Sequence, residues 1–308
     1  MSFDRGQLPD RDEPWGFRGG RREVRNVQAD SRVFYVDENN TLANDDNTGE
    51  DPAYPLLTIT QAVTNCRAYK GDTIFVLSND GWTYGGGSVD PIQETVVIPA
   101  TKSGIKLIGI GGGALGVYWM PGVAGETCLT IYALDVVVIG FAFTGDGAAA
   151  NGIYCEWNGT TMLGENTIIA YCFFDESIDI AIQLEWSWFC SIHHCYFQEC
   201  DTYGIYADAG GSATAYNQIH DNYFTDVATA AIALLGSSDN NSIHDNRVYG
   251  DPTGTNNFID LTDGDDNIVA GNYLNCSIAQ YDTTCSDATS GGWLFNHCDD
   301  GPPLAPPT

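Results

Sequence analysis

Positive charge is scarce in this sequence. Its 308 residues include 12 Lys and Arg against 41 Asp and Glu, a formal net charge of −29. Residues 1–32 hold seven of the basic residues and six of the acids, so residues 33–308 hold 12 − 7 = 5 basic and 41 − 6 = 35 acidic residues. A body with a net charge of −30 repels nucleic acids, anionic lipids and polyanionic glycans. We therefore expect no nucleic-acid partner and no insertion into a membrane.

Long apolar runs are scarce as well. Residues 1–26 are polar and charged, unlike a signal peptide or a transmembrane segment, so we expect the protein to be made in the cytoplasm of its host. Ten cysteines in a large chain without an export signal predict mostly free thiols. The irregularly spaced Cys276, Cys285 and Cys298 are the cysteines whose disulfide state stays open.

Turn-forming and strand-forming residues are plentiful. The chain has 35 Gly and 16 Tyr, many Asn and Asp, and only three Met. Glycine, asparagine and aspartate favour turns, and tyrosine favours strands. The composition therefore predicts an all-β protein with many short strands.

One seven-residue phrase recurs through the second half of the chain, as SIHHCYF (191–197), QIHDNYF (218–224) and SIHDNRV (242–248). Aligned on its first apolar residue, the phrase recurs in steps of 31, 31, 23, 27, 24 and 26 residues, at Leu107, Val138, Ile169, Ile192, Ile219, Ile243 and Val269. A second apolar phrase follows in the same register, centred on Ile153, Ile182, Ile205, Ile232 and Ile259. Repeats of this period indicate a solenoid.

Two strand phrases in each period, with alternating apolar and polar residues, predict a single-stranded right-handed parallel β-helix over residues 33–275. We expect Thr58 to begin a short N-terminal capping helix. The fourth place of the phrase predicts a ladder of like side chains at an interior turn: Cys172, Cys195, Asn222, Asn246 and Asn272. Stacked amides in such a ladder hydrogen-bond along the rod.

The stretch from Phe34 to Val76 resembles the opening of the pectin-lyase-like β-helix superfamily. It has a strand, a turn rich in Gly, Asp and Asn, a P-x-x-T-I-x-x-A capping helix and a GDT strand, and the resemblance covers roughly residues 33–275. It implies the fold but no single activity, because the superfamily includes lyases, hydrolases, adhesins and viral spikes. The GHG and RxK strings of polygalacturonase-like enzymes do not occur, and Arg247 is the only basic residue after Lys106 that could serve a lyase-like mechanism. The prediction therefore leans against an enzyme, with glycoside hydrolase as the class if it is one.

Two segments lie outside the predicted rod. Residues 276–308 are predicted to form a C-terminal cap and a Pro-rich tail. Residues 1–32 are predicted to form an extended basic arm that docks the rod onto an assembly, through the arginines Arg5, Arg11, Arg18, Arg21, Arg22 and Arg25.

Histidines and acids supply the candidates for metal binding and catalysis. His193, His220 and His244 hold the same outward place on successive coils, where they would bind a transition metal or pack at a subunit interface. Two acid groups are weak candidates for glycoside hydrolysis, which needs two carboxyl groups about 5 to 10 Å apart. These groups are Asp175, Glu176, Asp179 and Glu185, and Asp260, Asp263, Asp265 and Asp266. Asp265 and Asp266 also suit Ca²⁺, and no other cofactor is expected.

Aromatic residues supply a candidate sugar-stacking surface or subunit interface at Trp157, Trp186, Trp188 and Tyr206.

Together the features of the sequence predict a bacteriophage virion protein, such as a head decoration, fibre or short spike. It would be a homotrimer whose arm binds capsid or tail proteins. The first alternative is a tailspike-like protein that binds or hydrolyses a host glycan. The second is a carbohydrate-active β-helix protein of a bacterial surface.

Overall fold

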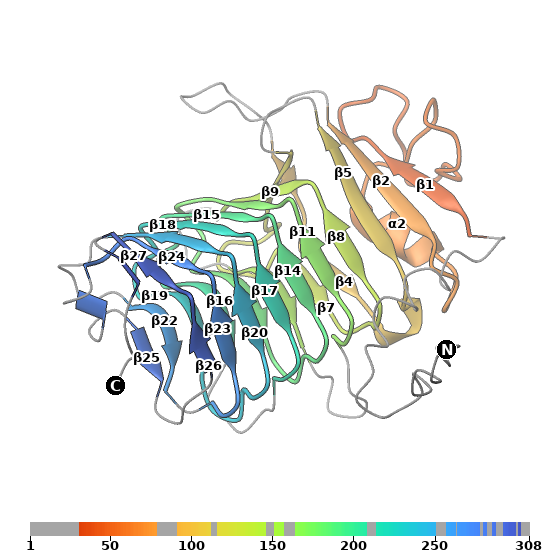
Figure 1. Cartoon of the computed structure of the whole chain (residues 1–308). Coiled ribbons are helices and arrows are strands. Elements are labelled where there is room, and N and C mark those ends of the chain that lie inside the picture. The colour runs from red at the N-terminus through yellow and green to blue at the C-terminus, as the bar shows by residue number, and fades with distance from the viewer. Residues whose placement is uncertain are drawn as a thin grey trace, which may run out of the picture.

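The computed structural model describes residues 31–78, 91–111, 116–145, 151–156, 164–207, 214–250, 257–262, 264–277, 280–281, 285–287, 292–299 and 301–302. These residues form a rod of short strands that lie side by side along its axis (Figure 1). Every strand pairing is parallel, and three sheets run along the rod. The fold is the all-β parallel β-helix predicted from the repeats.

We name the three sheets A, B and C. Sheet A has ten strands: β1 (Val33–Val36), β2 (Thr73–Ser78), β5 (Lys106–Gly111), β8 (Val137–Ile139), β11 (Ile168–Ala170), β14 (Ser191–His193), β17 (Gln218–His220), β20 (Ser242–His244), β23 (Ile268–Ala270) and β26 (Gly292–Leu294). Sheet B has nine: β3 (Ile92–Gln93), β6 (Val117–Met120), β9 (Phe141–Phe143), β12 (Phe173–Phe174), β15 (Tyr196–Gln198), β18 (Tyr223–Thr225), β21 (Arg247–Tyr249), β24 (Tyr273–Leu274) and β27 (His297–Cys298). Sheet C has eight: β4 (Val96–Ile98), β7 (Leu129–Ile131), β10 (Asn151–Cys155), β13 (Ile180–Leu184), β16 (Tyr203–Ala207), β19 (Ala230–Leu234), β22 (Asn257–Leu261) and β25 (Cys285–Asp287).

Each coil runs from sheet A through sheet B to sheet C and back to sheet A. The repeated phrase contains two strands rather than one, because a corner residue separates its sheet A part from its sheet B part, as between β17 and β18. The predicted register is confirmed: Ile169 pairs with Ile192, Ile192 with Ile219 and Ile219 with Ile243. In sheet C the predicted column is confirmed as well, since Ile205 pairs with Ile232.

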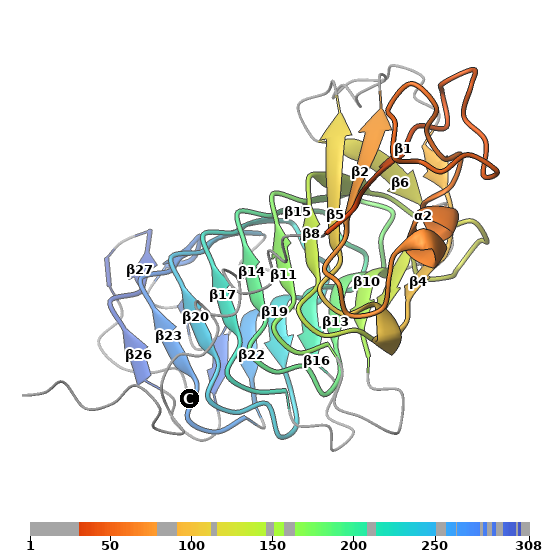
Figure 2. The same ribbon diagram turned by 90° about the vertical axis from the view of Figure 1, so that its right-hand side faces the viewer.

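A short helix covers the N-terminal end of the rod. Helix α2 (Ile59–Asn65) begins after Thr58, whose side chain accepts a hydrogen bond from the Gln61 N–H at 3.1 Å. Its apolar face packs against β1, β2 and β4 (Figure 2). A 3₁₀ turn follows at Ala100–Lys102. Among the described residues no helix is long and apolar enough to cross a membrane.

A stack of phenylalanines fills the centre of the rod. Phe174, Phe197 and Phe224 lie one above another, with ring centroids 4.9 and 4.4 Å apart and nearly parallel planes. The recurring glycine of sheet C makes room for this stack. A Cβ atom at Gly204 would lie 2.9 Å from the Phe224 ring and 2.5 Å from the carbonyl oxygen of Ala231.

Asparagine amides bridge the coils at the corner between sheets A and B, as predicted. The Oδ1 atom of Asn246 accepts from the backbone N–H and from the Nδ2 atom of Asn222, both at 3.0 Å. Asn246 Nδ2 donates to the Ile219 carbonyl at 2.9 Å and to Asn272 Oδ1 at 3.0 Å. The ladder starts at Asn222, whose Oδ1 atom accepts a hydrogen bond from the backbone N–H of Cys195. The thiol and amide positions are therefore continuous, as predicted.

A second amide ladder, which we did not predict, lies at the corner between sheets C and A. The Cys190 N–H donates to Asn217 Oδ1 at 2.8 Å, the N–H and Nδ2 of Asn217 donate to Asn241 Oδ1 at 3.0 Å, and Asn241 repeats the pattern toward Asn267. The sequence does carry this signal, because an asparagine stands two residues before Ile219 and before its counterparts on the next two coils. Both edges of sheet A are therefore tied along the rod by buried amides.

The rod continues past residue 275. Strands β25, β26 and β27 add one strand each to sheets C, A and B, so the predicted boundary between the β-helix and a C-terminal cap was placed one coil too early. Gly292–Leu294 and His297–Cys298 carry the phrase in a degenerate form, which hid this coil in the sequence. The six arginines of the predicted docking arm lie in residues 1–30, outside the described residues, which include only residues 31 and 32 of that arm.

All ten cysteines are buried and stand as thiols, in agreement with the prediction that most of them form no disulfide. This includes Cys276, Cys285 and Cys298, and the Sγ atoms of Cys276 and Cys298 lie 3.5 Å apart in the last coil. Most of the cysteines act as small buried apolar groups in the core.

The amide ladder predicts that the loss of one amide side chain strongly destabilises the folded protein. Asn246→Ala removes four hydrogen bonds and leaves buried groups of Asn222 and Asn272 without this partner, so we expect a loss of about 2–4 kcal/mol in the free energy of unfolding. Urea unfolding measures the change, with Ser242→Ala on the outer face as the control. Equal midpoints for the two variants would contradict the role of the ladder.

Candidate functional site

The corner between sheets A and B presents one outward side chain on each coil. The corner residues, which adopt left-handed backbone angles with φ between 53° and 69°, are Tyr171, His194, Asp221, Asp245 and Gly271. This conformation costs about 1–2 kcal/mol for a residue with a Cβ atom. The amide ladder directly after Asp221, Asp245 and Gly271 holds the bend, so the corner can carry side chains other than glycine.

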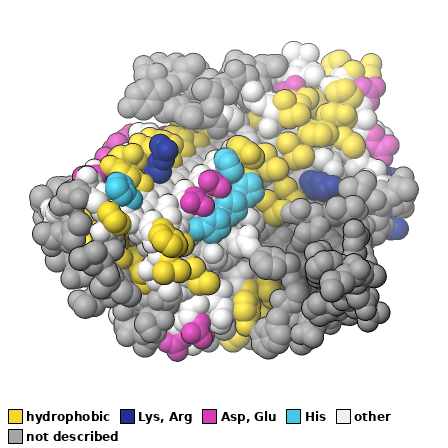
Figure 3. Space-filling view, viewed as in Figure 1, with side chains coloured by type: hydrophobic (Ala, Val, Ile, Leu, Met, Phe, Trp, Pro, Cys, Tyr) yellow, Lys and Arg dark blue, Asp and Glu magenta, His cyan; other side chains and the backbone are white. Residues whose placement is uncertain are grey.

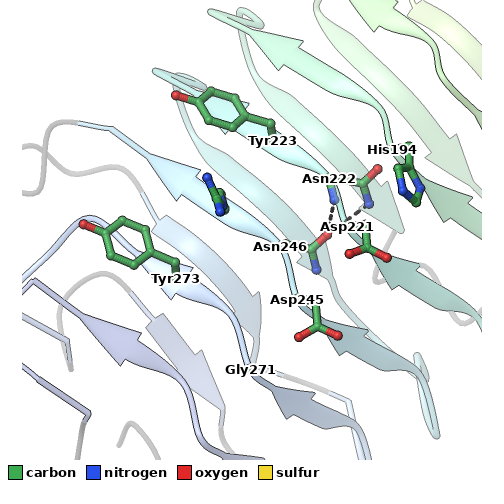
Figure 4. A pocket seen from close by; sticks show the side chains of 9 residues that line it. His194, Asp221, Asn222, Tyr223, Asp245, Asn246, Gly271 and Tyr273 are labelled. Atoms are coloured by element: carbon green, nitrogen blue, oxygen red, sulfur yellow. Dashed lines mark hydrogen bonds between the residues drawn. The ribbon is translucent and has the colours of Figure 1, made fainter.

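A groove of about 550 Å³ lies over this corner. Asp221 and Asp245 from the corner and Tyr223, Arg247 and Tyr273 from sheet B line it, together with His194. In Figure 4 the two carboxylates lie in a row along the rod, and the rings of Tyr223 and Tyr273 extend from β18 and β24 of sheet B, on either side of β21. We call this surface the A–B groove.

The predicted histidine column lies on sheet A beside the A–B groove and forms a stack. His193 and His220 have ring centroids 5.0 Å apart, and His220 and His244 have centroids 4.9 Å apart with planes 1° from parallel. The histidine side chains form a row on this face, next to acidic side chains (Figure 3). The register of sheet A therefore places the three imidazoles as the sequence predicted.

Two of the imidazoles are oriented by the corner carboxylates. His220 Nδ1 donates to Asp221 Oδ2 at 2.8 Å, and His244 Nδ1 donates to Asp245 Oδ2 at 2.9 Å. In a neutral imidazole this leaves Nε2 as the acceptor. The hydrogen bond from His220 lowers the pKa of Asp221, so this carboxylate stays ionised.

The stack also affects His193. Its partial burial lowers its pKa, and the neighbouring His220 and His194 lower it further. No group of three or more His, Cys, Asp or Glu side chains in the described part of the chain has the arrangement of a metal site. The transition-metal hypothesis for His193, His220 and His244 gains no support from this geometry.

Tyrosines form a second column, on the outer face of sheet B. Tyr196 and Tyr223 stack with centroids 4.8 Å apart, Tyr249 lies 5.0 Å from Tyr223, and Tyr273 lies 5.5 Å from Tyr249. At the end of the column the Tyr273 hydroxyl donates to Asp299 Oδ1 at 2.7 Å, which raises the pKa of Tyr273 to about 12.

The first predicted acid group is divided by a strand. Asp175, Glu176 and Asp179 precede β13, whereas Glu185 follows it, so Glu185 lies about 20 Å along the chain from Asp179. Asp175 is buried, which raises its pKa, and Asp179 accepts a hydrogen bond from the Thr202 hydroxyl. The four acids therefore do not form one catalytic group.

The second predicted acid group lies at the end of β22, which contains Asp260, and in the turn that follows it. Asp260 accepts from the backbone N–H of Thr262, and the N–H of Asp265 donates to Asp239. Asp265 and Asp266 are exposed, and Asp263 lies outside the described residues. Calcium binding by this turn stays a prediction.

A different carboxylate pair, partly missed in the sequence, lies at the corner between sheets C and A. Glu156 and Glu185 occupy the same place on successive coils, with backbones about 4.8 Å apart. A hydrogen bond to Glu156 raises the pKa of Tyr132 to about 12. Burial and a hydrogen bond to Glu185 raise the pKa of Tyr154.

The predicted aromatic residues lie near this pair. Trp186 and Trp188 follow Glu185 and are half-buried, and Trp188 bridges to Ala215 on the next coil. Tyr206, on the outer face of sheet C, stacks on Tyr203 at 4.3 Å. Trp157 lies outside the described residues.

Much of the A–B groove was not predicted from the sequence. Tyr223 and Tyr273 lie in the sheet B part of the phrase, after the predicted interior turn, but they were not among the predicted site residues. Asp221 and Asp245, which follow His220 and His244 in the sequence, were not among them either. The position of the corner is the signal that could have found the groove, because a bend at Asp221 and Asp245 brings these carboxylates beside the tyrosines of sheet B.

The histidine stack predicts linked titrations. In His220→Ala we expect the pKa of Asp221 to rise, because its donor is lost, and the pKa of His193 to rise, because a neighbouring imidazole is lost. NMR titration of the imidazole and carboxylate signals measures both values. His297→Ala, at the end of the rod, is the control, and an unchanged His193 in His220→Ala would contradict the coupling.

The same shifts set the sign of the pH dependence of stability. The lowered pKa of Asp221 contributes stability above its ordinary value of 3.8, and this contribution is lost as the pH falls through the lowered value. The lowered pKa of His193 means that the folded chain loses stability as the pH falls from 6.5 through its lowered value.

Comparison with known proteins supports the fold. Residues 139–274 match the family described as "Right handed beta helix region". No curated protein matches the chain. A solved structure of a mutant of the PL6-family alginate lyase AlyGC is similar at 14% identity with a TM-score of 0.36, over 77% of this chain and 39% of the lyase chain. This chain therefore spans less than half of that lyase, and the likeness carries no argument about fold or activity. The family match and the three-sheet topology together make this chain a right-handed parallel β-helix protein.

Proposed function

We propose that this protein binds a neutral, extended glycan along the A–B groove. The observation that carries the proposal is the convergence of two carboxylates, one guanidinium and the edges of two tyrosines on one elongated surface, repeated at the spacing of the coils. A rod with a coil repeat of about 4.8 Å offers similar contacts at regular steps along its axis. A polymer with its own repeat suits such a surface.

The chemistry of the groove suits hydroxyl groups. Asp221 and Asp245 each have acceptor capacity beyond the bond from the adjacent histidine, and vicinal hydroxyls of a sugar can donate to them. Arg247 is exposed on sheet B between Tyr223 and Tyr273 and supplies donors to sugar oxygens. The tyrosine faces are largely taken by stacking, so this groove binds mainly through polar edges.

The charge of the protein favours a neutral glycan over an acidic one. The chain carries a net charge of −29, and the groove holds two carboxylates against one guanidinium. A polyuronate or sulfated glycan would be repelled both at long range and in the groove.

We expect the A–B groove to bind a glycan without cleaving it. Glycoside hydrolysis needs one carboxyl group that is protonated near neutral pH. Asp221 has a lowered pKa, because His220 donates to it. The groove therefore favours a binding role over a hydrolytic one.

Loss of the guanidinium should weaken glycan binding. Arg247→Gln removes a charged donor worth about 1.5–3 kcal/mol, so we expect roughly 10- to 100-fold weaker binding of the neutral oligosaccharide that an array of such glycans selects. Titration calorimetry measures the affinity. Arg32→Gln is the matched control, because Arg32 is an exposed arginine that pairs with Glu50 and lies far from Arg247 in the sequence. Equal affinity of Arg247→Gln and the wild type would contradict the proposed site.

Hydrolysis at a second site is the other candidate, favoured by the spacing of Glu156 and Glu185. A retaining hydrolase holds its two carboxyl groups about 5–5.5 Å apart, close to the separation of adjacent coils. The hydroxyls of Tyr132 and Tyr154 and the nearby Trp186 would then line a cleavage site separate from the A–B groove.

If this site is catalytic, Glu185→Gln should abolish release of reducing ends from a neutral polysaccharide, a loss of at least about 1,000-fold. The conservative control is Glu199→Gln, at an exposed corner of another coil. Residual activity of Glu185→Gln equal to that of the control would exclude this pair, and the absence of any cleavage by the wild type would leave binding as the function.

The role as a virion protein stays a prediction. It depends on the arginine-rich arm, which lies outside the described residues, and on capsid or tail partners. A glycan-binding β-helix rod is compatible with that role and with a place on a bacterial surface.

A further inference from the structure

The outer face of sheet A differs from the other two faces in its exposed apolar side chains. Three large apolar side chains on the strands of sheet A, those of Ile110, Ile268 and Leu294, are 49%, 49% and 52% exposed. Among the described residues, the strands of sheet C have one such side chain, Val97, and those of sheet B have none. Ile268 and Leu294 lie on the adjacent strands β23 and β26, and Ile110 lies on β5 toward the other end of the sheet. Exposed apolar side chains that gather on one face are typical of an interaction surface.

Exposed aromatic residues border the same face. Phe189 and Tyr216 stack with centroids 5.3 Å apart at the corner between sheets C and A, and Tyr171 stacks on His194 at 5.0 Å at the opposite corner. Phe189, Tyr216 and Tyr171 all adopt left-handed backbone angles, which are unfavourable for bulky residues. Burial of these rings against a partner would offset that cost. Hydrophobic side chains lie around the histidine row on this face (Figure 3).

The polar groups of the face are self-complementary. No strand of sheet A contains Asp or Glu, and Lys106 is its only Lys or Arg. The outward polar residues of its middle strands are Ser191, Gln218 and Ser242 and the stacked histidines. Hydroxyl and amide groups each donate and accept, and the Nε2 atoms of His220 and His244 accept, so two identical faces can pair these groups. A basic partner would need carboxylates on these strands.

The size of the face suits a subunit interface. Ten strands about 4.8 Å apart extend over roughly 43 Å, and strands of three to six residues with their corners are about 15–20 Å wide. The footprint is therefore on the order of 650–850 Å² per chain. Stable interfaces bury about 800 Å² per partner.

We propose that the outer face of sheet A binds a second copy of this chain, so that the rods associate side by side. Tyr223, Arg247 and Tyr273 of the A–B groove belong to sheet B and lie outside the proposed interface, whereas the corner residue His194 of the groove borders it. The proposal goes beyond glycan binding and does not depend on it. The repulsion between two chains of net charge −29 is screened by salt, so association should strengthen as salt increases.

Sedimentation velocity of the full chain at micromolar concentration and 0.15–0.5 M NaCl tests the proposal. We expect the wild type at two or three times the chain mass of 33.3 kDa. Ile268→Asp should shift the protein to a single chain, because it buries a carboxylate in the interface. Val97→Asp, a matched exposed apolar residue on sheet C, should leave the assembly intact.

A second measurement covers the case in which Ile268→Asp fails to fold, as judged by circular dichroism. Ser242→Cys on sheet A should form a covalent dimer with a short bis-maleimide, and Thr130→Cys on the outer face of sheet C should not. A wild type that sediments as a single chain at every salt concentration would overturn the proposal. Loss of assembly in both aspartate variants, or equal cross-linking of both cysteine variants, would overturn it as well.

Discussion

The hydrogen bonding of stacked asparagine amides at the corners is the interaction on which the rest of this structure depends. Parallel sheets pair the backbone groups of the strands, but the corners between sheets have no ladder of their own. Asn222, Asn246 and Asn272 supply one at the first edge of sheet A, and Asn217 and Asn241 supply one at the second. Each amide accepts from the coil before it and donates to the coil after it, so the two edges of sheet A repeat without a shift.

This regularity turns a repeated sequence into columns of side chains. Because the corners hold the register, histidines separated by 24 to 27 residues stack at about 5 Å, and the tyrosines of sheet B do the same. The inner columns make the core and the outer columns make the surfaces. The A–B groove is the place where the outer columns of two sheets meet at a bend, and the same regularity makes the outer face of sheet A flat and repetitive.

The sequence predicted what depends on periodicity. The pairing of Ile192 with Ile219, the Asn246 ladder and the cap at Thr58 all follow from spacing and from the hydrogen-bonding capacity of single residues. The prediction from the sequence was wrong where one residue changes the direction of the chain. A left-handed corner at Asp221 divides the phrase between two sheets, and this brings Tyr223 beside Asp221 and Asp245. The acids that are close in sequence, such as Asp179 and Glu185, were separated for the opposite reason, because a strand lies between them. The last coil was missed because Trp293 stands where the other coils have an aliphatic residue at the start of the phrase.

Hydrogen–deuterium exchange of the full chain with a mixture of neutral oligosaccharides tests the central claim, that the A–B groove is the binding surface, most directly. If the glycan binds there, we expect slower exchange in residues 220–224, 244–249 and 271–275, which form the corner and the adjoining strands of sheet B. Slower exchange around Glu156 and Glu185 alone, or no change anywhere in the chain, would contradict it.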